Sequence, residues 1–229
     1  MNSKKLLKLF DSSDSEEEMP KRELKVKING DVYRACYHHA LSTQSQEIVG
    51  LLIGQVEDNI ISISALKIVK RLDKKKDRVE ISDEQMMEAM LYADHLKTKY
   101  QRPECNIVGW YHSHPHITVW PSHVDLKTQF NYQRMSQDWI GLIFAVYNKD
   151  KANFSTRYEL VAFQAELDKD ENLSRITLPI EVVNNGTCMS KHVKDEMVKL
   201  SDILLEEIKE GHSEENTDYL SALKRDLGM

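Results

Sequence analysis

The feature that most constrains this chain is the short stretch from His112 to Asp125, which has the spacing His-x-His-x10-Asp. The residues just before it, 106–111, are apolar and rich in β-branched and aromatic side chains, so they predict a buried strand. Alternate side chains of a strand point to the same face, and His112 and His114 would therefore share one. Pro115 lacks the amide hydrogen that a strand needs and is expected to end it.

A helix is expected to begin soon after this strand. Ser122 is a typical N-cap residue, and Asp125 would then lie in the first helical turn. Two imidazoles at a strand end and one carboxylate at a helix start can converge on one point, and three such ligands with an open position are typical of a catalytic zinc site. A simpler explanation stays open, because His-x-His pairs are common and Asp125 and Ser122 can both be capping residues.

The whole block resembles the JAMM (MPN-plus) metalloprotease motif. It contains His112-Ser-His114-Pro followed by Ser122 and Asp125, and an upstream glutamate at the start of a strand, Glu47-Ile-Val-Gly-Leu-Leu-Ile-Gly, completes the motif. The surrounding residues are similar to one branch of that family, the lysine-63-specific deubiquitinase subunits of the BRISC and BRCA-associated complexes. The motif is specific because four separated positions must agree.

The resemblance implies a fold, a chemistry and partners. The fold would be the α+β MPN (JAMM) domain, a mixed β-sheet flanked by helices, with a C-terminal helical extension. One zinc ion per chain would be held by His112, His114 and Asp125, with Glu47 as general base and then acid. Ser122 would hydrogen-bond the oxyanion.

The resemblance also implies that the substrate is lysine-63-linked polyubiquitin, cleaved at isopeptide bonds by a multiprotein complex in the cytoplasm and nucleus. The partner would be a catalytically silent MPN homologue, an Abraxas-like scaffold, docked through C-terminal helices.

Other classes of protein fit less well. A zinc deaminase needs His-x-Glu with a downstream Pro-Cys-x-x-Cys, and a zincin needs His-Glu-x-x-His; the sequence has neither. The serious alternative is a non-enzymatic MPN scaffold that binds ubiquitin or a partner MPN protein, although such scaffolds have usually lost a ligand or the glutamate. His116 and His123 lie near the motif and are not expected to be ligands.

Composition bounds the class of protein. With 229 residues, 41% of them hydrophobic and 30% charged, the chain is expected to form one globular domain with an appendage. A net charge of -6 gives no expectation of nucleic-acid binding. Three widely spaced cysteines predict reduced thiols of a cytosolic or nuclear protein. The longest apolar run is too short to cross a membrane, so no membrane partner is expected.

Three segments are expected along the chain. Residues 1–22 are rich in acidic residues and serine and predict a disordered acidic tail. Residues 23–185 would form the catalytic domain, and residues 186–229 a helical extension for partner docking. One face of the first helix in this extension carries apolar residues at helical spacing: Val193, Met197, Leu200, Leu204 and Ile208. Either a partner or the chain's own domain would cover this stripe.

The composition of the basic segment 70–78 predicts a solvated loop in preference to a contact with ubiquitin.

The remaining patterns predict the other elements. Strands are expected at 24–28, 47–56, 60–69, 106–111, 139–147, 154–163 and 175–182. Helices are expected at 32–41, 82–100 and from 122 onward. The first helix would bury Val32, Cys36, His39 and Ala40, and the second would bury Met86, Met90, Ala93 and Leu96 or Lys97.

Overall fold

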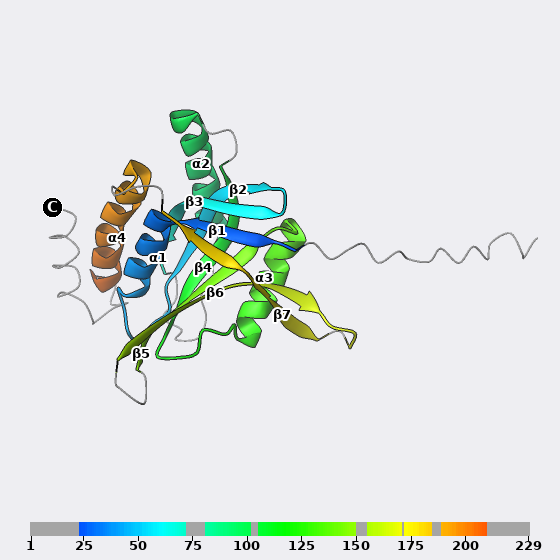
Figure 1. Cartoon of the computed structure of the whole chain (residues 1–229). Helices are drawn as coiled ribbons and strands as arrows, with labels where there is room; N and C mark the ends of the chain where they lie inside the picture. The colour runs from blue at the N-terminus through cyan, green and yellow to red at the C-terminus, as the bar shows by residue number, and fades with distance from the viewer. Residues whose placement is uncertain are drawn as a thin grey trace, which may run out of the picture.

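The computed structural model describes residues 23–71, 81–101, 105–149, 155–170, 172–184 and 189–209. These residues form a mixed sheet with the strand order β7-β6-β5-β4-β2-β3-β1-β8 and helices on both of its faces (Figure 1). The strands are β1 (Lys25–Asn29), β2 (Val49–Glu57), β3 (Ile60–Val69), β4 (Asn106–Pro115), β5 (Ile140–Lys149), β6 (Thr156–Leu167), β7 (Leu173–Leu178) and β8 (Ile180–Val183). The helices are α1 (Gly30–Ala40), α2 (Asp83–Tyr100), α3 (His123–Met135) and α4 (Lys191–Lys209). The expected α+β fold is confirmed.

Both faces of the sheet are buried. On β2, Leu52 packs with α1 and α4, whereas its neighbour Leu51 packs with α2 and α3. On β4, Tyr111 and Trp110 divide between the two faces in the same way. Because β2, β4 and β5 are covered on both sides, each contains a run of apolar residues, which is why the motif strand was recognisable from sequence. Within the described residues, no helix combines the length and apolar character that crossing a membrane requires.

The prediction of one closing strand over 175–182 is wrong. Pro179 divides this segment into β7 and β8, because proline has no amide hydrogen to give to a ladder. β7 pairs antiparallel with β6 at one edge of the sheet, and β8 pairs parallel with β1 at the other edge. The amide of Val26 donates to the carbonyl of Pro179 at 2.9 Å. The two edges are therefore close together, and the sheet is curled.

Helix α2 confirms most of the expected pattern. Ser82 is its N-cap and forms a capping box with Gln85, as the sequence signature predicts. Ala93 and Leu96 are buried, but Met90 is 46% exposed, so its assignment to the core is wrong. Ala89, one residue earlier, is buried instead of Met90, because the buried face of α2 is rotated slightly from the expected one.

Helix α4 packs on its own domain (Figure 1). Four residues of the expected apolar stripe are buried in the same cluster as α1 and β3: Val193, Met197, Leu200 and Leu204. The side chain of Ile208 lies outside the described residues. Of the two coverings left open for this stripe, the structure shows the chain's own domain packed over these four residues. The expected tail 1–22, the basic segment beyond Arg71 and the extension beyond residue 209 also lie outside the described residues.

Candidate metal centre

The two histidines lie near the end of β4, in the middle of the sheet. β4 pairs with β2 on one side and β5 on the other, and His112 is opposite Val49 of β2. Because their positions differ by two residues, His112 and His114 project from the same face as Trp110, toward α2 and α3. Both are almost fully buried, at 0% and 2% exposed. The predicted shared face is confirmed.

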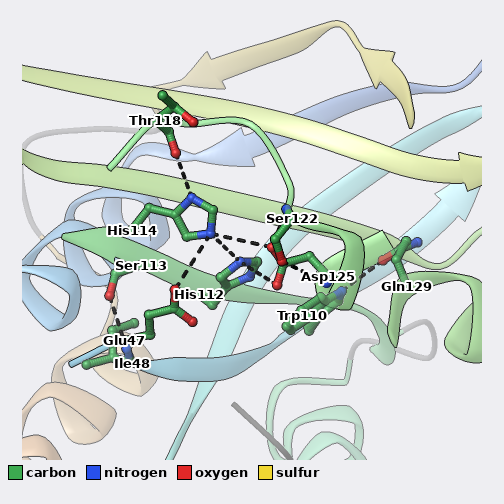
Figure 2. A network of polar contacts seen from close by, with 10 residues as sticks. All are labelled: Glu47, Ile48, Trp110, His112, Ser113, His114, Thr118, Ser122, Asp125 and Gln129. Carbon is green, nitrogen blue, oxygen red and sulfur yellow. Dashed lines mark hydrogen bonds and ion pairs between the residues drawn. The ribbon is translucent and has the colours of Figure 1, made fainter. Parts of the chain in front are cut away.

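The start of α3 supplies the carboxylate. Ser122 is the N-cap, and its Oγ accepts from the amide of Asp125 at 3.2 Å. The amide of Ser122 donates to Asp125 Oδ2 at 2.6 Å, which completes a reciprocal capping box. These two bonds fix the rotamer of a buried carboxylate, and Figure 2 shows it beside the imidazoles.

The three side chains have the separations that a metal ion needs. His112 Nε2 lies 3.1 Å from His114 Nε2 and 3.3 Å from Asp125 Oδ1, and His114 Nε2 lies 3.6 Å from Asp125 Oδ2 (Figure 2). Ligand atoms at 2.0–2.2 Å from a tetrahedral zinc ion are roughly 3.3 Å from one another. The two nitrogens and the carboxylate could therefore hold a zinc-sized ion. Among the described residues, these three side chains form a group of possible metal ligands with the required spacing.

Neighbouring groups orient both imidazoles. The carbonyl of Thr118 lies 2.6 Å from His114 Nδ1, so in the neutral ring Nδ1 carries the proton and the lone pair of Nε2 points into the site. The ring of His112 stacks on Trp110, with centroids 4.5 Å apart and an angle of 16°. Trp110 in turn donates from Nε1 to the buried side chain of Gln129 at 2.8 Å. The rings are thus held in place by contacts outside the triad.

The electrostatics of the site favour a cation. Burial disfavours the charged form of each group. At His114, hydrogen bonds to Asp125 and to the carbonyl of Thr118 outweigh burial and raise the pKa of the imidazole. At Asp125, burial is outweighed by the charge of His112 and by hydrogen bonds from His112, His114 and Ser122, which hold the pKa of the carboxyl well below its usual range. Asp125 is therefore an anion at physiological pH.

Glu47 lies beside this group, just before β2. Its Oε1 is 3.9 Å from His114 Nε2, farther than any contact within the triad. The next residue is anchored to β4: the amide of Ile48 donates to Ser113 Oγ at 3.0 Å, and the amide of Ser113 donates to the carbonyl of Ile48 at 3.2 Å. Sequence reasoning missed Ser113. Its position between the histidines indicates that it faces the other side of the sheet, but not what it binds there.

Beneath the site, Tyr111 forms a buried hydrogen bond with α1. Its hydroxyl lies 2.9 Å from His39 Nδ1. Burial raises the pKa of the Tyr111 phenol, so the hydroxyl keeps its proton. Gly50 makes room for the ring, because a Cβ at this position would lie 2.3 Å from the Tyr111 ring. The glycine inside β2 is thus required by packing under the candidate metal centre.

The other candidates near the motif lie outside the triad. His116 adopts a left-handed backbone with φ 61° and stacks on Tyr147. His123 is exposed at the start of α3. Trp120 is 44% exposed, and the guanidinium of Arg175 lies 4.1 Å above its ring.

Comparison with known proteins identifies the family. Residues 21–138 match the family model described as JAB1/Mov34/MPN/PAD-1 ubiquitin protease. The chain is 44% identical over 183 residues to the Lys-63-specific deubiquitinase BRCC36 of Camponotus floridanus, covering 80% of this chain and 70% of that protein. It is 44% identical to the Xenopus laevis protein of that name, with the same coverage, and 36% identical to the Pongo abelii protein, covering 85% and 88%. As the motif predicted, the chain belongs to the JAB1/Mov34/MPN/PAD-1 family of ubiquitin proteases, which are isopeptidase enzymes.

Proposed function

We propose that this chain is a zinc-dependent deubiquitinase that hydrolyses the isopeptide bonds of lysine-63-linked polyubiquitin. The observation that carries the proposal is the spacing of donor atoms at His112, His114 and Asp125, with the carboxylate of Glu47 beside them. The printed name of the relatives, Lys-63-specific deubiquitinase, supports the choice of linkage.

The triad would hold the zinc ion through Nε2 of His112, Nε2 of His114 and the carboxylate of Asp125. A bound zinc ion supplies a Lewis acid that polarises a carbonyl and lowers the pKa of water to about 7. The carbonyl of Thr118 keeps His114 in the tautomer that leaves Nε2 free for a ligand bond. The capping box keeps Asp125 oriented toward the imidazoles.

Glu47 is the proposed general base and then general acid. It accepts a proton from the attacking water and delivers a proton to the lysine amine that leaves. Its neighbour Ile48 is bonded to Ser113, so the position of the carboxylate is constrained before substrate binds. Ser122 is the proposed donor to the oxyanion. As a cap, its oxygen accepts from the amide of Asp125. Its hydroxyl, which donates to the Asp125 carboxylate, would turn to donate to the oxyanion when substrate binds.

Two further parts of the proposal are supported by the motif resemblance alone. The chain would work as the catalytic subunit of a complex, beside a catalytically silent, Abraxas-like MPN homologue. The complex would act in the cytoplasm and the nucleus.

Cleavage of linkage-defined diubiquitin tests the proposal. The full chain, loaded with zinc, is incubated with lysine-63-linked, lysine-48-linked and linear diubiquitin, with and without a co-expressed MPN partner. We expect cleavage of the lysine-63 linkage in preference to the others, and faster cleavage with the partner. Glu47→Gln prepared in the same way measures the activity of contaminating proteases. A folded, zinc-loaded chain that cleaves no linkage under either condition would favour the non-enzymatic scaffold.

A further inference from the structure

Arg71 is a buried cation that the proposed mechanism does not use. It lies just after β3 and is 7% exposed. Its Nε and Nη2 donate to Oε2 of Glu207 at 3.1 and 2.5 Å, and its backbone amide donates to Oε1 at 3.0 Å. Glu207, in the last turns of α4, is only 2% exposed. Since both charges are desolvated and share three bonds, their relative position is tightly defined.

The same guanidinium reaches the segment that enters β2. Arg71 Nη1 donates to Oε1 of Gln46 at 2.6 Å. Arginine has only donors, so the bond also fixes which way the Gln46 amide is turned. Gln46 directly precedes Glu47 in the sequence. One side chain therefore connects the end of α4, the end of β3 and the residue before the proposed general base.

Glu47 thus lies between two anchored neighbours. On one side the side chain of Gln46 is bonded to Arg71, and on the other side the backbone of Ile48 is bonded to Ser113. Residues 41–47 lie outside any strand or helix, so no ladder of hydrogen bonds holds this stretch. Proton transfer needs the carboxylate placed to within a fraction of an ångström, which such a stretch supplies only when it is anchored.

We propose that Gln46 is a positioning residue for Glu47, held in place by the Arg71–Glu207 pair, so that helix α4 takes part in setting turnover. The effect on turnover rests on the proposed function, whereas the anchoring of Gln46 by Arg71 does not. The competing account is that Arg71 and Glu207 only fasten α4 to the sheet and that Gln46 is a passive neighbour.

Substitutions at Gln46 separate these accounts, because they leave the Arg71–Glu207 pair intact. Gln46→Leu removes the acceptor and keeps the size of the side chain. Gln46→Glu keeps an acceptor and places a carboxylate against the guanidinium, so it should restore the anchor. Gln44→Leu is the matched control, since Gln44 is exposed two residues earlier in the same stretch. Gln46 is only partly buried, so the variants are expected to fold, and Gln46→Ala repeats the test with a smaller side chain.

Amide hydrogen exchange of the full chain tests the anchoring without any activity measurement. We expect exchange in residues 43–48 to be at least about threefold faster in Gln46→Leu than in the wild type, because the stretch opens more often. Gln44→Leu and Gln46→Glu should match the wild type. Unchanged exchange in both Gln46→Leu and Gln46→Ala would overturn the proposal.

Steady-state cleavage of lysine-63-linked diubiquitin tests the consequence. In Gln46→Leu we expect kcat to fall about tenfold at unchanged KM and unchanged zinc content, with recovery in Gln46→Glu. A kcat within twofold of the wild type would overturn the positioning role, as would loss of zinc, which would mean that Gln46 supports the metal site as a whole. A wild type without isopeptidase activity would refute the proposed function instead, and the exchange measurement would still decide whether the anchor exists.

Discussion

At the scale of single residues, Glu47 lies 3.9 Å from the nearest imidazole nitrogen, whereas Asp125 lies 3.3 and 3.6 Å from the two imidazoles. Removing the charge of Glu47 should therefore spare the metal and remove only proton transfer. We expect Glu47→Gln to keep its zinc content and melting temperature while turnover falls by about 100-fold or more. Metal analysis, thermal melting and diubiquitin cleavage check this. Loss of zinc in this variant would make Glu47 a ligand.

His39 should make the stability of the fold depend on pH. Burial, with the nearby charge of Arg71, lowers the pKa of His39 to about 3. The unfolded chain takes up a proton near pH 6.5 and the folded chain does not, so stability is lost as the pH falls from 6.5 toward 3. By pH 5.5 the loss is about 1 kcal/mol relative to pH 7.5.

His39→Gln should abolish this loss, because glutamine does not titrate and can still face the hydroxyl of Tyr111. Denaturant unfolding of both proteins at pH 7.5 and 5.5 measures the difference. The raised pKa of His114 changes the free energy of unfolding with pH in the opposite direction. Both proteins contain His114, so its effect cancels when they are compared. Equal pH dependence in the two proteins would show that His39 titrates normally.

At the scale of elements, the N-terminus of α3 combines capping with the proposed chemistry at Ser122. Alanine removes the cap and should cost about 1 kcal/mol of unfolding free energy, whereas glycine costs only a few tenths. Both remove the hydroxyl, so both should lower kcat by about 100-fold or more. Denaturant unfolding and diubiquitin kinetics of Ser122→Ala and Ser122→Gly check this. If Ser122→Gly kept nearly full activity while the less stable Ser122→Ala lost activity, the loss would follow stability, and Ser122 would be only a cap.

Helix α4 should behave as part of the core. Leu200 is fully buried against the domain. We expect Leu200→Ala to lower the free energy of unfolding by about 2–5 kcal/mol. Lys194→Ala, on the exposed side of the same helix, should change it by less than about 0.5 kcal/mol. A stable Leu200→Ala would show that α4 is loosely attached, and the stripe would again be a candidate for partner docking.

At the scale of the whole molecule, the sequence predicted features that have local causes. The N-caps at Ser82 and Ser122, the motif strand and the two strands that follow Glu47 depend on residues close together in the chain, and the structure confirms all of them. The shared face of His112 and His114 follows from strand geometry alone.

Features that depend on distant segments were missed. The split of 175–182 between two edges follows from the curl of the sheet, and Pro179 by itself does not show that its neighbours pair with different strands. The stripe on α4 indicated a buried face but not what covers it. The bonds that anchor the Glu47 segment join residues far apart in the sequence, such as Arg71 and Glu207, and no spacing rule connects them.

The candidate metal centre lies beside two hydrophobic cores that are packed without a metal ion. Hydrophobic clusters fill both faces of the sheet, so the chain should stay folded when the metal is removed. A ligand that binds only the folded state at 100 times its Kd adds about 2.7 kcal/mol of stability. For a chain of this length, we therefore expect a chelator to lower the melting temperature by about 5–10 °C.

Two histidine variants show whether this shift comes from the proposed triad. His114→Ala should melt at the temperature of the metal-free wild type, bind little zinc and show no response to the chelator, because a two-ligand site holds zinc weakly. His123→Ala, an exposed histidine close by in sequence, should bind one zinc ion per chain and respond as the wild type does. Complete unfolding of the wild type by chelator would mean that the metal is structural. A normal response in His114→Ala would place the metal elsewhere.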